Sequence, residues 1–180
     1  MPLSNGQVFW IFGLSGAGKS TMATALIAKL RSEHFPVLAL DGDALRSGLC
    51  RGLGFTDADR TENLRRAAEV ARLGADSGLC VIASFITPLE VHRQLIRQIV
   101  GPDRISLIYA DAPLEVCRLR DVKGLYARAR AGDVPQMTGI SSSFEVPTQT
   151  DLVQPTGTLA PEASSRILRD FAMTRFGHTT

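Results

Sequence analysis

The segment GLSGAGKS at residues 13–20 constrains the fold of this chain more than any other stretch. It follows an apolar run at residues 8–12 and precedes an apolar-periodic segment over residues 21–30. A G-x-x-x-x-G-K-[ST] pattern between a strand and a helix is typical of a loop whose backbone N–H groups surround phosphates. The helix N-terminus adds partial positive charge at the same place. The segment therefore predicts a nucleoside triphosphate site.

The side chains of this loop have distinct expected roles. Lys19 supplies a mobile ammonium group for the outer phosphates, and Ser20 supplies a hydroxyl for the coordination shell of Mg²⁺. The other expected nucleotide-binding residues of the segment are Gly13, Ser15, Gly16, Ala17, Gly18 and Thr21. A glycine-rich turn that binds nothing is the alternative, but the strand, the spacing, the lysine, the hydroxyl and the helix all agree with a phosphate loop.

Apolar segments of strand length alternate with helical segments along the chain. The expected strands are residues 8–12, 36–40, 80–84, 105–110 and 151–154. The expected helices are 19–31, 44–49, a long one from 56, one after 88, 113–120, 124–132 and a last one after 161. This alternation predicts the α/β class, with a parallel sheet covered on both faces. With 44% hydrophobic residues, we expect residues 1–180 to form one domain.

Charge and cysteine usage exclude several classes of protein. A formal net charge of +2 argues against binding of bulk nucleic acid or of a membrane through a polybasic surface. The sequence has no signal peptide and no apolar span of transmembrane length, so we expect a cytoplasmic protein. Cys80 and Cys117 lie in apolar runs and are expected in the core, whereas Cys50 lies in a polar loop and is a candidate reactive thiol.

A phosphate loop requires a carboxylate near its metal ion, commonly at the end of a neighbouring strand. The expected strand at 36–40 is followed by Asp41-Gly42-Asp43, and in an extended segment the two carboxylates point the same way. One carboxylate can orient Mg²⁺ while the other accepts a proton from an attacking hydroxyl. Asp111 follows another strand, but its place before Ala112 and Pro113 is more typical of a turn and a helix cap.

Polar and aromatic residues beyond this turn indicate a second, anionic substrate. The group comprises Arg46, Arg60, Asn63, Arg65 and Arg66. Arginines commonly bind phosphate or sulfate with two parallel hydrogen bonds, although each one alone is also typical of a solvated helix face. Phe55 and Phe144 lie in loops and either sandwich a base or pin those loops. His92 is interpreted as a helix-face residue rather than a ligand.

Taken together, these motifs resemble the adenylylsulfate (APS) kinase family over about residues 6–172. The segments that carry the resemblance are GLSGAGKS at 13–20, DGD at 41–43 with Arg46, LGFTDADRTEN at 53–63, APLEVC at 112–117, KGLY at 123–126, ARAG at 129–132, TGI at 138–140 and FE at 144–145. The resemblance implies a P-loop kinase with a five-stranded parallel sheet. It implies phosphorylation of the 3′-hydroxyl of APS by MgATP, giving 3′-phosphoadenylylsulfate (PAPS) and ADP in sulfate activation. Such enzymes usually form homodimers or larger homo-oligomers, and they occur alone or fused to ATP sulfurylase.

The resemblance also implies roles for individual residues. Asp43 would be the base near the 3′-hydroxyl, with Asp41 in the magnesium shell and Lys19 as the third catalytic residue. The APS-binding residues would be Asp43, Arg46, Phe55, Arg60, Asn63, Ile86, Thr87, Lys123, Gln136, Met137 and Phe144, with Phe55 and Phe144 on the two faces of the adenine. Arg120 and Leu159 would flank the ATP base. Residues 123–147 would form a lid, which we expect to become ordered when ligands bind because it has little apolar periodicity.

The chain departs from the usual family pattern at Thr87, Ala44, Ser141 and Val122. None of these departures removes a residue of the phosphate loop or of the DGD turn, so the resemblance implies an active enzyme. Two alternatives stay open at the level of the sequence. One is another P-loop small-molecule kinase, and the other is a regulatory domain that binds APS or PAPS without turnover.

Overall fold

A computed structural model describes residues 6–133 and 136–176, and five parallel strands form one sheet in this part of the chain. The strands are β1 (Val8–Phe12), β2 (Val37–Asp41), β3 (Cys80–Phe85), β4 (Ile105–Ala110) and β5 (Leu152–Gln154). Their order across the sheet is β2-β3-β1-β4-β5. The predicted α/β class and five-stranded parallel sheet are thus confirmed, with strand limits within one residue of those expected.

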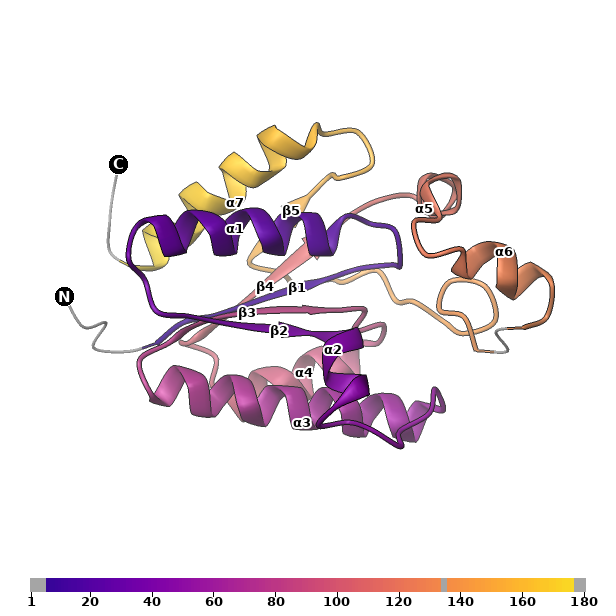
Figure 1. Ribbon diagram of the computed structural model, residues 1–180, viewed down its shortest axis with the longest axis horizontal. Coiled ribbons are helices and arrows are strands. Elements are labelled where there is room, and N and C mark those ends of the chain that lie inside the picture. The colour runs from indigo at the N-terminus through magenta and orange to yellow at the C-terminus, as the bar shows by residue number, and fades with distance from the viewer. Residues whose placement is uncertain (1–5, 134–135, 177–180) are drawn as a thin grey trace.

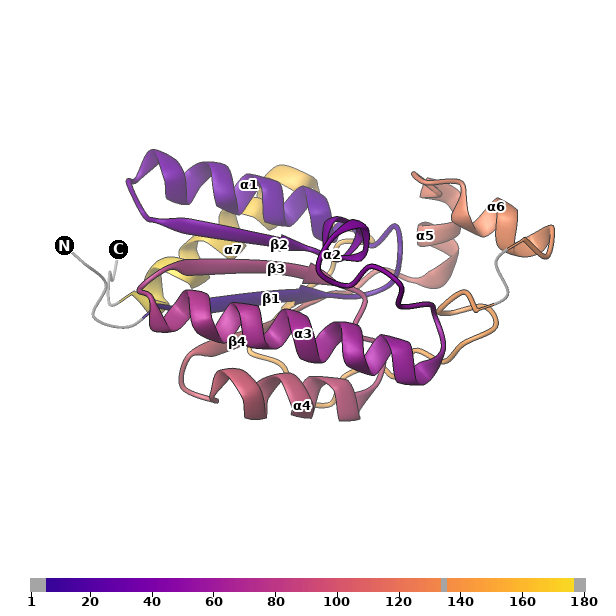
Figure 2. The ribbon, with the colours of Figure 1, turned by 60° about the horizontal axis from the view of Figure 1, so that its bottom comes forward.

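Helices cover both faces of the sheet (Figures 1 and 2). The helices α1 (Lys19–Ser32) and α7 (Pro161–Arg175) lie on one face, and α3 (Asp57–Asp76) and α4 (Glu90–Val100) lie on the other. Three short helices, α2 (Gly42–Ser47), α5 (Leu114–Arg120) and α6 (Leu125–Arg130), lie near the carboxyl ends of the strands. Of the helices in the described ranges, none combines the length and the apolar character needed to cross a bilayer.

Strand β1 separates two hydrophobic clusters, because alternate side chains of a strand point to opposite faces. Phe9 and Ile11 pack with α1 and α7 on one face. Val8, Trp10 and Phe12 pack on the other face, under α3 and α4. All five residues are fully buried, which explains why the strand reads as a continuous apolar run rather than an alternating one.

The long helix α3 begins where the sequence predicted, with Thr56 as its N-cap. The Thr56 hydroxyl accepts a hydrogen bond from the Asp59 backbone N–H (3.1 Å) and donates one to the Asp59 carboxylate (2.7 Å). Small residues at Ala67, Ala68 and Ala71 are buried against the sheet. These small side chains let the helix approach the strands closely.

The segment from Asp41 to Asp43 differs from the extended geometry that we expected. Strand β2 ends at Asp41, and helix α2 begins at Gly42, two residues earlier than predicted. The Asp41 carboxylate accepts hydrogen bonds from the N–H groups of Asp43 (3.0 Å) and Ala44 (3.3 Å), which is the action of an N-cap. The two aspartates therefore do not share one face of a strand: Asp41 caps a helix, and Asp43 lies in its first turn.

The structure contradicts the interpretation of Cys50 as a candidate reactive thiol of a polar loop. Its side chain is fully buried, and its backbone N–H donates to the Leu45 carbonyl (2.7 Å) in the turns that follow α2. Burial raises the pKa of the Cys50 thiol, which disfavours the reactive thiolate. Cys80 and Cys117 are buried as expected, and His92 is buried on α4 with its Nε2 atom 3.1 Å from the Thr61 hydroxyl.

We expect Thr56→Ala to lower the free energy of unfolding by about 1 kcal/mol, because the N-terminus of α3 loses its side-chain cap. Urea denaturation followed by circular dichroism measures this change. Thr56→Ser keeps the hydroxyl and should stay close to the wild-type value. Equal losses in the two variants would show that the methyl group, and not the cap, is responsible.

Candidate active site

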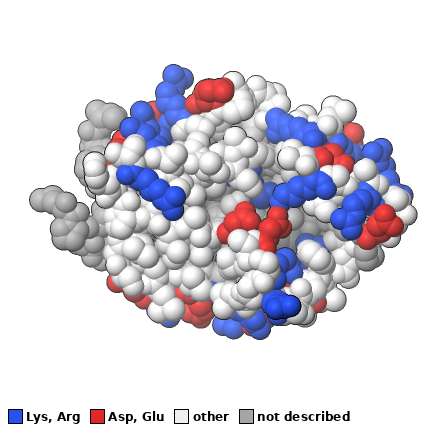
Figure 3. All heavy atoms as spheres, in the orientation of Figure 1, with Lys and Arg blue, Asp and Glu red and all other residues white. Residues whose placement is uncertain are grey.

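A cleft of about 540 Å³ opens at the carboxyl edge of the sheet, between the phosphate loop, α2, the start of α3 and the segment after α5. Most of the residues predicted for the site line this cleft. They are Ser15, Gly16, Gly18, Lys19, Ser20, Thr21, Asp41, Asp43, Arg46, Phe55, Arg60, Asn63, Ile86, Thr87, Arg120, Lys123, Gln136, Met137 and Leu159. Basic and acidic side chains are interspersed on the right-hand half of the surface in Figure 3. A cleft of this size accommodates small-molecule ligands.

The backbone of the phosphate loop requires glycine at its tightest points. A Cβ atom on Gly13 would lie 2.5 Å from the Ala110 carbonyl oxygen, and one on Gly16 would lie 2.9 Å from that of Cys117. Gly18, at the start of α1, has φ 92° and provides no side chain to cap the helix. The first turn of α1 also contains no acidic residue. The N-terminus of α1 is therefore open to an anion from the cleft.

Three side chains donate to carbonyl groups of the phosphate loop. The Lys19 ammonium donates to Leu14 (2.6 Å), the Tyr126 hydroxyl to Ser15 (2.9 Å) and the Arg120 guanidinium to Gly16 (3.3 Å). These bonds connect the phosphate loop to α1, α6 and α5, respectively. Burial lowers the pKa of Lys19 to about 8, and this effect outweighs the opposing influence of nearby acidic groups.

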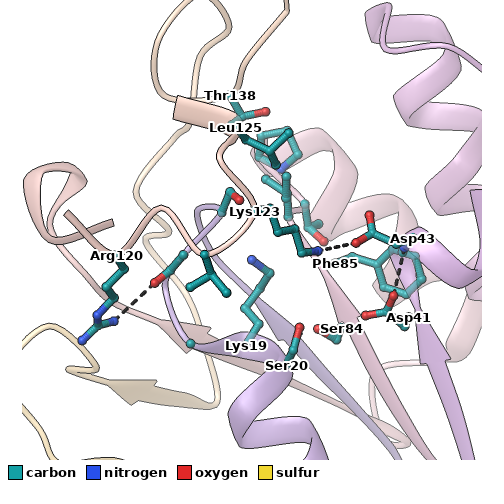
Figure 4. A pocket seen from close by; sticks show the side chains of 18 of the residues that line it. Lys19, Ser20, Asp41, Asp43, Ser84, Phe85, Arg120, Lys123, Leu125 and Thr138 are labelled. Atoms are coloured by element: carbon teal, nitrogen blue, oxygen red, sulfur yellow. Dashed lines mark hydrogen bonds and ion pairs between the residues drawn. The ribbon is translucent and has the colours of Figure 1, made fainter. Parts of the chain in front are cut away.

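Oxygen-bearing side chains lie opposite Lys19 (Figure 4). Ser20 projects from α1, while Asp41 and Ser84 are neighbours on adjacent strands, because Asp41 of β2 pairs with Ser84 of β3. The Asp41 Oδ1 atom accepts both N-cap hydrogen bonds, so its second oxygen is available to a ligand. Hydroxyl and carboxylate oxygens are the ligands that Mg²⁺ prefers, and it commonly keeps several waters. Ser20 and Asp41 therefore fit a magnesium ion that arrives with a nucleotide.

Lys123 reaches across the cleft and forms an ion pair with Asp43. Their side chains are 53% and 71% exposed, respectively. Exposed pairs of this kind contribute little to stability, about 0–1 kcal/mol, so a bound anion can replace Asp43 as the partner of Lys123 at small cost.

The half of the cleft near α3 contains arginines and an exposed aromatic ring. The Arg46 guanidinium lies 4.4 Å from the centroid of the Phe55 ring, whose side chain is 56% exposed. Arg60 is almost fully buried, and it donates to the Phe55 carbonyl (2.9 Å), to the Thr138 hydroxyl (2.7 Å) and to the Gln136 carbonyl. Arg60 thus connects α3 to the segment expected to form a lid.

Asn63 is buried, yet its Oδ1 atom has no hydrogen-bond partner among the described residues. An unpaired buried amide oxygen is costly, by about 1–3 kcal/mol. Because Asn63 lines the cleft, a ligand group that bonds to its amide would remove this cost.

Three of the described residues of the expected lid are buried, although the segment has little apolar periodicity. Tyr126 and Met137 belong to the core cluster that includes the phosphate-loop residues Leu14 and Ala17, and Thr138 is also buried. Residues 134 and 135 of the expected lid lie outside the described residues. Ser141, where the family usually has a carboxylate, accepts a hydrogen bond from the Met137 N–H (2.9 Å).

Some predicted site residues do not line the cleft. Phe144 stacks on Tyr109 with ring centroids 6.1 Å apart, in a separate depression beside Asp111. Gly13 and Ala17 belong to the phosphate loop, but both are buried and neither lines the cleft. Arg65 and Arg66 pair with Glu62, which agrees with the solvated-face alternative. Asp111 does not cap α5, since Pro113 occupies that position.

Other lining residues were not predicted from the sequence. They include Ser84, Tyr126, Thr138, Thr156 and Ser164. Ser84 could have been found from the register, because a parallel neighbour of Asp41 must end at the same edge of the sheet. No sequence signal indicates Tyr126, because its contact with the loop depends on how the chain returns after α5.

Comparison with known proteins agrees with this geometry. A family model described as adenylylsulphate kinase matches residues 5–154. The chain belongs to the adenylylsulphate kinase family. An adenylyl-sulfate kinase of Paraburkholderia xenovorans (strain LB400) is 52% identical over 153 residues, which cover 85% of this chain and 85% of that protein.

Solved structures of this family resemble the fold. The structure of the Mycobacterium tuberculosis APS kinase in complex with AMPPNP and APS matches with a TM-score of 0.88 and 41% identity, covering 93% of this chain and 98% of that one. A hexameric APS kinase from Thiobacillus denitrificans matches with a TM-score of 0.69 and 27% identity, covering 97% of this chain and 30% of that one. Membership of the family is therefore supported by sequence and by fold.

We expect ATP binding to take up protons at about pH 8.5, because part of the Lys19 population is then neutral and the phosphates favour its charged form. At about pH 6.5 Lys19 is already charged, so its contribution disappears. Isothermal titration calorimetry in buffers of different ionisation enthalpy measures the uptake. Lys19→Met is the control, and uptake at the higher pH that persists in this variant would contradict the assignment to Lys19.

Proposed function

We propose that this chain transfers the γ-phosphoryl group of ATP to the 3′-hydroxyl of APS, giving PAPS and ADP in sulfate activation. The observation that carries the proposal is the two-part cleft of a member of this family. One part is the phosphate loop with Lys19 and Ser20. The other part contains Arg46, Phe55 and Asn63, whose amide oxygen has no hydrogen-bond partner among the described residues. This arrangement suits a triphosphate on one side and an anionic nucleotide on the other.

The donor nucleotide binds with its phosphates at the N-terminus of α1 and its base between Arg120 and Leu159. Arg120 also donates to the Thr156 carbonyl (2.7 Å), which connects the loop after β5 to the phosphate loop through one guanidinium. Ser20 and Asp41 would hold Mg²⁺, which would neutralise charge on the outer phosphates. Lys19 stabilises the charge on the phosphoryl group during transfer.

The acceptor binds with its 3′-hydroxyl near Asp43. In the transfer, the 3′-oxygen forms a bond to the γ-phosphorus, the bond from that phosphorus to the β–γ bridging oxygen breaks, and the hydroxyl proton passes to Asp43. Before the transfer, Lys123 exchanges Asp43 for an anionic group of the acceptor, which frees the carboxylate to act as a base. The Asp43–Lys123 ion pair supports this role, because it brings both groups to one side of the cleft.

Arg46, Phe55 and Asn63 bind the remaining parts of APS. One face of the Phe55 ring lies against Arg46, so the exposed ring can stack on the adenine. The buried Asn63 amide lines the same space, where its unpaired oxygen can accept a hydrogen bond from a hydroxyl or amino group of APS. Ile86, Thr87, Gln136 and Met137 line the same space, and Phe144 joins the adenine contact only if its segment moves away from Tyr109.

An ADP-release assay tests this function. Wild-type enzyme with MgATP should release ADP rapidly with APS and slowly without it. Asn63→Leu should raise the KM for APS about tenfold or more, since the ligand loses a bond to a buried amide, and should leave the KM for ATP nearly unchanged. The same variant should unfold at an equal or higher urea concentration, because it removes an unpaired buried oxygen and nearly conserves volume.

Three outcomes would contradict the proposal. Binding of APS without faster ADP release would indicate the regulatory alternative. Fast ADP release with other hydroxyl acceptors but not with APS would indicate another small-molecule kinase. An equal rise of both KM values in Asn63→Leu would show that Asn63 serves the fold rather than the acceptor.

We also propose that the chain forms a homo-oligomer, which is supported by the family and by the hexameric relative. A homodimer would be the smallest such homo-oligomer. Association with or fusion to ATP sulfurylase stays a prediction from the family, as does the cytoplasmic location.

The lid proposal predicts a change in amide exchange. We expect exchange over residues 123–133 and 136–147 to slow when ADP and APS are both bound, and much less with ADP alone, because Lys123 in this stretch would contact the acceptor. Tyr126 and Met137 should already be protected without ligand, since both are buried. Hydrogen exchange measured by mass spectrometry tests this, and equal protection of the whole stretch in every state would contradict a lid.

A further inference from the structure

The charged side chain of Arg93 on α4 is only 1% exposed, and it does not line the cleft. Its guanidinium lies 5.3 Å from the centroid of the Phe12 ring. Nε donates to the Glu90 carboxylate (2.8 Å), which is partly exposed. A buried arginine is stable only when its donors are satisfied, so the other contacts of this group define what it does.

Two contacts of Arg93 reach the loop after β3, which lines the cleft. Nη1 donates to the carbonyl oxygens of Thr87 (3.3 Å) and Pro88 (3.4 Å). Thr87 has φ 46°, a conformation that is strained for a β-branched residue. Its hydroxyl accepts a hydrogen bond from Trp10 Nε1 (2.9 Å). Trp10 and Arg93 therefore maintain an unfavourable backbone conformation at the wall of the cleft.

A third contact of Arg93 reaches the segment at the end of the lid. Nη2 donates to the Glu145 carbonyl (3.1 Å), and the Glu145 N–H donates to the Pro88 carbonyl (2.8 Å). The Glu145 carboxylate in turn accepts a hydrogen bond from the N–H of Glu90 (2.6 Å). One buried guanidinium thus joins the loop after β3, the start of α4 and the segment that follows Phe144.

The loop fixed by Arg93 adjoins the turn that carries Asp43. A Cβ atom on Gly42 would lie 3.3 Å from the Phe85 ring and 3.6 Å from the Ser84 carbonyl oxygen, so the end of β3 packs directly against this turn. The donor side of the cleft is fixed by other groups, namely Tyr126 and Arg120. A substitution of Arg93 would therefore alter the acceptor side of the cleft more than the donor side.

We propose that Arg93 is a positioning residue for the acceptor. It holds Thr87 and Pro88 in the strained conformation that shapes the acceptor side, and it fixes the end of the lid to the same loop. The inference rests on the proposed function, because it specifies which of the two substrates depends on this buried group. A residue that served only stability would affect both substrates alike.

The test compares Arg93→Met and Arg93→Lys with Arg97→Met. Arg97 lies one turn later on α4, and its ion pair with Asp151 (2.8 Å) is away from the cleft. We expect Arg93→Met to raise the KM for APS about tenfold or more and to lower kcat, with the KM for ATP changed by no more than about twofold. Arg97→Met should change none of these values.

Arg93→Lys keeps the buried charge and provides a test if the methionine variant does not fold. A single ammonium cannot reach all of the acceptors that the guanidinium fork serves, so the KM for APS should rise selectively but less. A normal KM for APS in either folded variant, or an equal rise of both KM values, would overturn this inference alone. Absence of APS-dependent ADP release in the wild type would overturn the proposed function as well.

Discussion

The central position of β1 determines where every functional segment lies. The strand pairs in parallel with β3 on one side and β4 on the other, and all of its residues are buried. Its backbone hydrogen bonds are made to these two neighbours and to adjoining residues such as Arg104, which fixes the register of all three strands. The phosphate loop leaves the carboxyl end of β1, the Ile86–Pro88 loop leaves β3, and Asp111 follows β4. The strand order changes direction at this point, and ligands of open α/β sheets bind at such a place.

The charged side chains in and around the cleft form two groups, one exposed to solvent and one buried in the protein. The Asp43–Lys123 ion pair is exposed and therefore weak, whereas Arg60 and Arg93 are buried and fully engaged with protein groups. The exposed Asp43–Lys123 pair would thus meet substrates, whereas Arg60 and Arg93 connect segments of the chain. This division explains why an excess of arginine and lysine near the site does not by itself identify the ligand-binding groups.

The sequence was sufficient to predict the fold, because continuous apolar strands and glycine-rich turns leave few alternatives. It was also sufficient to place Lys19, Ser20 and Phe55 at the cleft, because their positions follow from local motifs. It was insufficient where a side chain competes with regular structure. Asp41 caps a helix, so the DGD turn is not extended, and Cys50 is buried by turns whose path cannot be inferred from their polarity. The positions of Phe144, in a loop, and of Tyr126, on α6, depend on tertiary contacts that local sequence patterns do not specify.

The scarcity of lysine gives the lowered pKa of Lys19 a practical meaning. The lysines of this chain are Lys19, Lys29 and Lys123. Lys29 lies on the outer part of α1, paired with Glu33 (2.7 Å), while the other two meet in the cleft. Near neutral to mildly alkaline pH, the lowered pKa of Lys19 leaves part of its side chain as free amine, which is the form that acylating reagents modify. Acylation of Lys19 would therefore report on the nucleotide cleft, and a triphosphate bound there would shield the side chain from modification.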